Sequence, residues 1–173
     1  MKVDLAKYKK LFRAAKRKHD RIDIGIDIGI DIGQFGSRCA FFPLTKTVGI
    51  KIYELAEDRD ISYDNQVMAY KSKIAPKVVG KPFTFETYYG RYAYLTEIAE
   101  VDDEICGEDL YKLRAYKTLC RKIRGIGLSD TDLHGANVGY YKGKLVCIDF
   151  GPESHLDDSE CECELIYGCR FSR

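Results

Sequence analysis

The sequence predicts an α+β fold that encloses one core and contains a small antiparallel sheet. Short runs of alternating apolar and polar residues, separated by turn residues, indicate strands that pair as hairpins. Longer stretches carry apolar residues at helical spacing. A chain of 173 residues, of which 45% are hydrophobic, can bury one core but is short for two independent domains.

The overall charge gives no general attraction for nucleic acids or acidic partners. The 28 Lys and Arg residues nearly balance the 27 Asp and Glu residues, which leaves a net charge of +1. The sequence has no apolar run long enough to cross a bilayer, so we expect no membrane association and a cytoplasmic location. Its seven cysteines are scattered, which favours free thiols in a reducing compartment.

The first segment, residues 1–21, has the pattern of a basic amphipathic helix. Lysines and arginines surround four apolar residues at helical spacing, which are Leu5, Tyr8, Phe12 and Ala15. We favour a solvated helix that packs through this one stripe over a helix that binds nucleic acid or an acidic surface. In residues 22–33 an Ile-Asp-Ile-Gly repeat then places Ile at alternate positions, which favours an extended strand.

Strands and one helix are expected next. Residues 38–42 and 48–53 flank a Pro-Leu-Thr-Lys turn and predict two strands. Residues 60–74 predict a helix, and a proline at position 76 marks its exit because helical backbone is disfavoured before proline. Residues 83–88 and 92–98 alternate aromatic and polar side chains about a Tyr-Gly-Arg turn, which predicts a hairpin.

The remaining elements are a helix and a second hairpin. Residues 108–124 place apolar side chains at helical spacing and stop at Gly125, a residue that commonly ends helices. Residues 138–141 and 144–148 flank a short Lys-Gly turn and predict two paired strands. From residue 152 onward the sequence is acidic, then rich in cysteine, and shows no clear period.

The segment with the most chemical information runs from Asp130 to Asn137 and is followed, one hairpin later, by Asp149. Phosphoryl transfer needs a carboxylate to orient the acceptor hydroxyl and oxygen ligands for Mg²⁺. Asp132 and Asn137 lie five residues apart on one loop and can face the same site. The hairpin returns Asp149 to the side of that loop, so the segment supplies both requirements.

This pattern, Asp-Leu-His-Gly-Ala-Asn followed by Asp-Phe-Gly, resembles the catalytic centre of the protein-kinase-like superfamily, in particular aminoglycoside phosphotransferases and small atypical kinases. The resemblance implies that Asp132 is the catalytic base and that Asn137 and Asp149 bind Mg²⁺. It also implies a two-lobed kinase-like fold. The small antiparallel-sheet N-lobe would comprise residues 22–99, and a strongly reduced C-lobe would comprise residues 100–173.

The same resemblance implies a phosphate-binding region. The latter half of a kinase glycine-rich loop, where backbone amides approach phosphate oxygens, is similar to the segment containing Gly33, Phe35, Gly36 and Ser37. Lys51 resembles the strand lysine that contacts the ATP phosphates and acts with Asp132 in catalysis. In the family a Glu of the following helix holds this lysine. Here the best-placed residue is Gln66, which we expect to accept a hydrogen bond from Lys51.

The connection after the second strand of the first hairpin resembles the adenine-binding hinge of the same family. Backbone groups of Glu97 and Ala99 are the expected adenine partners. The expected cofactors are therefore ATP and Mg²⁺.

The resemblance implies a kinase that transfers phosphate from ATP to a hydroxyl acceptor, with a protein Ser/Thr hydroxyl preferred over a small molecule. A pseudokinase-like module that binds nucleotide or a partner without turnover is the main alternative, because Asp130 replaces a family histidine and the C-lobe is short. An adaptor that acts through the basic helix and a kinase-like enzyme that transfers AMP are further alternatives. A zinc site is less favoured, because its candidate ligands lack the usual two-residue cysteine spacing; they are His155, Cys161, Cys163 and Cys169.

Overall fold

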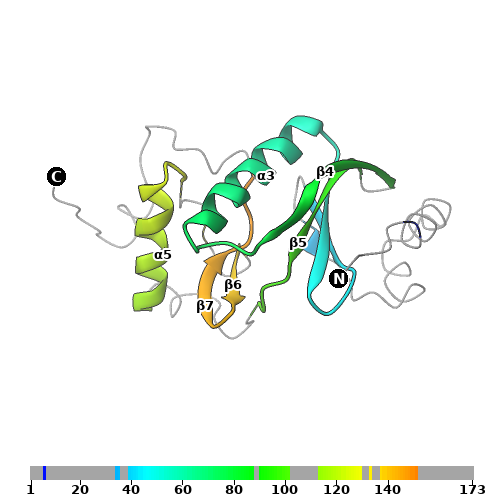
Figure 1. Cartoon of the computed structure of the whole chain (residues 1–173). Helices are drawn as coiled ribbons and strands as arrows, with labels where there is room; N and C mark the ends of the chain where they lie inside the picture. Colours follow the sequence, from blue (N-terminus) through cyan, green and yellow to red (C-terminus); the bar gives the residue numbers. More distant parts are fainter. Residues whose placement is uncertain are drawn as a thin grey trace.

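Five antiparallel strands form the main sheet of the molecule (Figure 1). The computed structural model describes residue 6 and residues 34–35, 39–87, 90–101, 113–129, 133 and 137–151. In this part of the chain the sheet order is β1-β2-β3-β5-β4. Its strands are β1 (Gln34–Phe35), β2 (Cys39–Pro43), β3 (Val48–Tyr53), β4 (Val78–Thr87) and β5 (Gly90–Glu97). The two strands expected around the Pro-Leu-Thr-Lys turn and the aromatic hairpin are confirmed, while the expected repeat strand lies outside the described residues.

β3 lies at the centre of this sheet and is buried along its whole length. Because successive side chains of a strand point to opposite faces, its residues divide into two sets. Val48, Ile50 and Ile52 join the apolar cluster on one face. Lys51 and Tyr53 lie on the other face, where Tyr53 contacts the helix α3 (Ala56–Lys71). A fully buried strand that carries a lysine is the first structural indication of a site.

β4 is longer than the sequence predicts. It begins at Val78 instead of Phe83, although Gly80 and Pro82 would ordinarily indicate a turn. Two features accommodate these residues: β4 is an edge strand, and its pairing with β5 shifts register between Val79 and Phe83. Glycine and proline are tolerated in strands at edges and irregularities of this kind.

The helix α3 packs against β3, β4 and β5, as Figure 1 shows. It occupies Ala56–Lys71. The prediction of a helix is correct, but the predicted range of 60–74 begins and ends too close to the C-terminus. The helix stops early because Lys73 has a φ of 60°, which ends helical backbone. Its buried face is mostly polar and consists of Ser62, Asn65, Gln66 and Ala69. Apolar burial alone therefore cannot orient α3 on the sheet.

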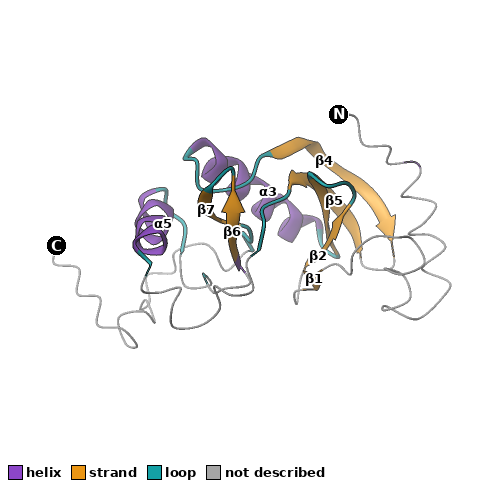
Figure 2. Cartoon of the chain, turned by 90° about the horizontal axis from the view of Figure 1, so that it is seen from below, coloured by secondary structure: helices purple, strands orange, loops and turns teal. Residues whose placement is uncertain are grey.

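A second group of elements follows the main sheet and includes the hairpin of β6 (Val138–Tyr141) and β7 (Lys144–Cys147) (Figure 2). Its turn confirms the prediction, because Lys142 and Gly143 both have positive φ, as a two-residue type I′ hairpin turn requires. The helix α5 (Arg114–Gly125) packs against β7; the predicted start at residue 108 lies outside the described residues. Apolar residues of α5, β6 and β7 form a second core cluster with the end of α3.

The molecule is thus a mixed α/β protein with a small antiparallel sheet, a separate hairpin and two helices in the described part of the chain. The two-lobed kinase-like arrangement, with lobes at 22–99 and 100–173, stays a prediction. Apart from residue 6, the expected basic helix in residues 1–21 lies outside the described residues, as does the tail from residue 152. No described helix has the length and apolar character needed to cross a bilayer.

Truncation of the β3 core should destabilise the protein. Ile52→Ala should lower the free energy of unfolding by about 2–5 kcal/mol, because Ile52 is fully buried and its loss leaves a cavity. Leu55→Ala is the control, since Leu55 is 60% exposed and its truncation should cost less than about 0.5 kcal/mol. Urea denaturation measures both values, and equal effects would contradict the packing of β3.

Candidate active site

The ammonium group of Lys51 joins two segments that are far apart in the sequence. Lys51 lies on β3, and its side chain is only 7% exposed. Its Nζ donates a hydrogen bond to the carbonyl oxygen of Ile148 at 2.7 Å and lies 3.3 Å from Oδ1 of Asp149. The structure therefore brings together two of the residues that the sequence singled out, one from the sheet and one from the end of β7.

The surroundings of Lys51 keep it protonated. Burial by itself lowers the pKa of this ammonium, but electrostatic attraction to the Tyr94 phenol oxygen and to the Asp149 carboxylate raises it, and the net direction is upward. Burial raises the pKa of the Tyr94 phenol, so this group is neutral near pH 7. Asp149 is then the anion of this pair that acts at neutral pH. A permanently charged lysine in a buried position is suited to bind an anionic group.

Asp149 is held in place by its neighbours at the end of β7. Its Oδ1 accepts a hydrogen bond from the backbone N–H of Phe150 at 2.8 Å, and Phe150 is itself buried in the second core cluster. The thiol of Cys147 donates to the carbonyl oxygen of Asp149 at 2.8 Å. The side chain of Asp149 remains 38% exposed, so its carboxylate can also meet a ligand.

Asn137 lies at the open end of the β6–β7 hairpin, opposite Ile148, the residue that precedes Asp149. The N–H of Ile148 donates to the carbonyl oxygen of Asn137 at 2.9 Å, directly after the last strand pair of the hairpin. An amide oxygen and a carboxylate are oxygen ligands of the type that Mg²⁺ prefers, so this donor set fits the expected metal. No group of three or more His, Cys, Asp or Glu residues suited to a metal occurs within the described ranges.

The expected catalytic base, Asp132, lies outside the described residues, but its neighbour Leu133 does not. Leu133 is buried, and its carbonyl oxygen accepts a hydrogen bond from the hydroxyl of Tyr116 at 2.7 Å. Tyr116 belongs to α5, so this helix anchors the chain next to Asp132.

Two residues of the expected glycine-rich loop, residues 33–37, are described, namely Gln34 and Phe35. Phe35 belongs to β1 and pairs with Ala40 of β2, while Gly33, Gly36 and Ser37 lie outside the described residues. The described part of this segment is therefore a short edge strand of the main sheet, paired with β2.

Glu97 and Ala99 lie where β5 leaves the sheet. The N–H of Glu97 donates to the carbonyl oxygen of Lys77 at 2.8 Å, and the carbonyl oxygen of Glu97 accepts from the Thr96 hydroxyl at 3.1 Å. A ligand can therefore use only the second lone pair of that carbonyl. Directly after Ala99, Glu100 exchanges both backbone hydrogen bonds with Tyr140 of β6 at 2.7 and 2.9 Å. These bonds fix the segment 97–100 between the sheet and the hairpin.

The expected interaction between Gln66 and Lys51 is wrong. The Gln66 Nε2 donates to the carbonyl oxygen of Pro76 at 3.1 Å and to Oγ1 of Thr96 at 2.6 Å. Its Oε1 accepts from the hydroxyl of Tyr94 at 2.8 Å. Both the nitrogen and the oxygen of the Gln66 amide thus form hydrogen bonds with groups other than Lys51. Two of these groups, Tyr94 and Thr96, belong to β5.

Gln66 is instead one member of a buried chain of hydrogen bonds, which we call the hydroxyl chain. Tyr53 donates to Ser62 at 2.7 Å, Ser62 lies 3.0 Å from the Tyr94 hydroxyl, and Tyr94 donates to Gln66. Each hydroxyl can accept from one neighbour and donate to the next, an arrangement in which successive bonds strengthen one another. The sequence interpretation missed this chain.

A signal for the hydroxyl chain was present in the sequence. Ser62 and Gln66 are four residues apart and so share one helix face, while Tyr94 and Thr96 alternate along one strand face. Nothing in the sequence indicated that these two faces meet.

Comparison with known proteins supplies no relative from which a function could be transferred. No protein-family model matches the chain, and no curated protein is significantly similar to it. Function must therefore be inferred from the residues and their geometry.

Breaking the hydroxyl chain should destabilise the protein. Tyr94→Phe should lower the free energy of unfolding by about 1–3 kcal/mol, because the buried Gln66 Oε1 would lose the Tyr94 hydroxyl as its donor and the Ser62 hydroxyl would lose one of its two partners. Tyr92→Phe on the same strand is the control and should change stability by less than about 0.5 kcal/mol. It retains the ring that lies 5.6 Å from the Arg59 guanidinium. Denaturant unfolding of both variants is the measurement, and equal stabilities would mean that the chain contributes nothing.

Proposed function

We propose that this chain is an ATP- and Mg²⁺-dependent phosphotransferase of the kinase-like type, with a protein Ser/Thr hydroxyl as the preferred acceptor. The observation that carries the proposal is the contact of the buried Lys51 ammonium with Asp149 at 3.3 Å. A strand lysine beside the aspartate of an Asp-Phe-Gly segment is the arrangement that phosphate binding next to a metal requires. The catalytic-loop pattern around Asp132 and Asn137 supplies the remaining groups.

Each residue has one role in this proposal. The Lys51 ammonium binds phosphate oxygens of ATP, and Asn137 and Asp149 hold Mg²⁺, which neutralises phosphate charge when bound. Asp132 orients the acceptor hydroxyl and takes its proton.

Backbone groups complete the proposed nucleotide site. The carbonyl of Glu97 and the N–H of Ala99 contact adenine, and the backbone around Gly33 and Gly36 approaches the phosphates. In this proposal residues 22–99 act as the N-lobe and residues 100–173 as a reduced C-lobe.

A second candidate function is a pseudokinase-like module that binds nucleotide without turnover. The specific observation in its favour is the engagement of Gln66 with Tyr94, Thr96 and Pro76. No acidic residue of α3 then holds Lys51 in the described structure, and the only carboxylate on its ammonium there is Asp149. Mass spectrometry of candidate acceptors after incubation with ATP and Mg²⁺ separates phosphate transfer, AMP transfer and no reaction.

The two catalytic aspartates should respond differently to substitution. Asp149→Asn should reduce Mg²⁺-dependent ATP binding, because it removes a charged metal ligand. Asp132→Asn should leave binding nearly intact and slow transfer by about a hundredfold or more, since it removes the base. Calorimetry measures binding, and mass spectrometry measures transfer. If both variants transferred phosphate at the wild-type rate, the enzyme proposal would fail.

Lys51 lies on β3 and Lys46 lies in the turn before it, so substitutions of these two lysines can be compared directly. Lys51→Met should lower the transfer efficiency by about a hundredfold, because a buried, preorganised cation is lost from the phosphate site. Lys46→Met, at the exposed β2–β3 turn, should have little effect. Thermal melts of both variants establish that the folded protein is being compared. Equal loss of activity in the two variants would show that Lys51 has no special role.

A further inference from the structure

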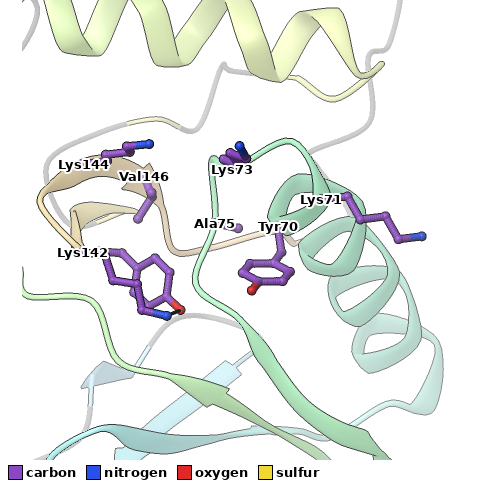
Figure 3. A pocket seen from close by; sticks show the side chains of 8 residues that line it. Tyr70, Lys71, Lys73, Ala75, Lys142, Lys144 and Val146 are labelled. Carbon is purple, nitrogen blue, oxygen red and sulfur yellow. Dashed lines mark hydrogen bonds between the residues drawn. The ribbon is translucent and has the colours of Figure 1, made fainter.

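A cavity lies apart from the candidate active site (Figure 3). It has a volume of about 380 Å³ and lies between the C-terminal end of α3 and the β6–β7 hairpin. Four of its eight lining residues are lysines; the lining consists of Tyr70, Lys71, Lys73, Ala75, Tyr141, Lys142, Lys144 and Val146. None of Lys51, Asn137 and Asp149 borders it, so it is separate from the proposed nucleotide site.

The cavity is strongly basic. Lys71, Lys73 and Lys144 are exposed and form no ion pair with any described residue. The fourth lysine, Lys142, lies 3.2 Å from the carboxylate of Glu97, to which Tyr141 also donates a hydrogen bond. In Figure 3 the ammonium of Lys71 is directed away from the other lining residues, whereas Lys73 and Lys144 lie at the same end of the cavity. Positive charge thus exceeds negative charge on its walls.

The two walls of the cavity are fixed relative to one another. The N–H of Cys147 on β7 donates to the carbonyl oxygen of Ile74 at 3.0 Å, which joins the hairpin to the segment after α3. Within that segment, Ile74 donates to Ala69 at 3.0 Å and Lys73 donates to Tyr70 at 2.9 Å. A ligand would therefore meet a largely preformed site, which lowers the entropic cost of binding.

Two of the lysines occupy backbone positions that normally favour other residues. Lys73 has a φ of 60° and Lys142 a φ of 51°, in the left-handed region. This region costs a side-chain-bearing residue roughly 1–2 kcal/mol and is usually occupied by Gly, Asn or Asp. Both turns end at the same cavity. Lysine is therefore less favourable than Gly, Asn or Asp for the backbone at both positions. Its presence at both agrees with a role of the side chains in binding.

From these observations we infer that the cavity binds a small organic molecule that carries more than one phosphate group. Lysine ammonium groups act as point charges for phosphate, and the hydroxyl of Tyr70 can donate a further hydrogen bond. Ala75 and Val146 supply apolar surface for the organic part of the ligand. The volume lies within the range of small-molecule sites, roughly 300–1,000 Å³, and is small for a folded protein partner.

Calorimetry with inorganic tripolyphosphate tests the charge recognition of this site on the full chain, with a chelator present to remove divalent cations. Lys73→Gln and Lys144→Gln should each weaken binding about fivefold, the effect of losing one charge near a solvated anion. Lys46→Gln removes the same charge from an exposed turn outside the cavity and should leave the affinity within about twofold. Circular dichroism establishes that the variants remain folded.

Glu97→Gln provides a test of opposite sign. It removes the carboxylate that competes for Lys142, so tripolyphosphate should bind more tightly than to the wild type. Because the proposed nucleotide site can also hold a triphosphate, Lys51→Met serves as a second background, in which Lys73→Gln and Lys144→Gln should still weaken tripolyphosphate binding about fivefold. This persistence distinguishes the cavity from the proposed nucleotide site.

Three outcomes would overturn the inference. One is the absence of binding at millimolar tripolyphosphate. Another is equal weakening by Lys46→Gln and Lys73→Gln, which would indicate diffuse charge attraction. The third is loss of binding in Lys51→Met alone, which would assign the anion to the nucleotide site.

Discussion

The rest of the structure depends on the buried ammonium of Lys51 finding a negative partner. A charged group on a fully buried strand is costly unless it is paired and hydrogen-bonded. The partners come from the end of β7, where Ile148 provides a carbonyl and Asp149 a carboxylate. The main sheet and the β6–β7 hairpin must therefore keep one relative position. The backbone pairing of Glu100 with Tyr140 and the bond from Cys147 to Ile74 maintain it.

The hydroxyl chain explains how α3 is held on the sheet with little apolar burial. Hydrogen bonds are directional, so a chain of them specifies one rotation and one register of the helix on the sheet. Packing of an apolar stripe is not directional and would specify this rotation and register less precisely. This arrangement also determines the surroundings of Lys51, because it directs Gln66 toward β5.

The β6–β7 hairpin connects the two proposed sites. Asn137 and Asp149 flank its open end, while Lys142 and Lys144 lie at its turn and border the basic cavity. An anion at the turn and a nucleotide at the open end would both contact this one short element. Coupling between them requires two states of the hairpin with different affinities for each ligand.

The sequence by itself determined the type and order of most elements. Alternation identified the β4–β5 hairpin, and turn residues identified β3 and the β6–β7 hairpin, because these features depend on residues close together in the chain. It also selected Lys51, Asn137 and Asp149 as residues of interest. The early end of α3 at the left-handed Lys73 and the extension of β4 through Gly80 and Pro82 were decided by the tertiary structure. So were the partners of Gln66, since Tyr94 lies 28 positions away. Local patterns specify strands and helices, but which polar groups meet inside depends on how the elements pack.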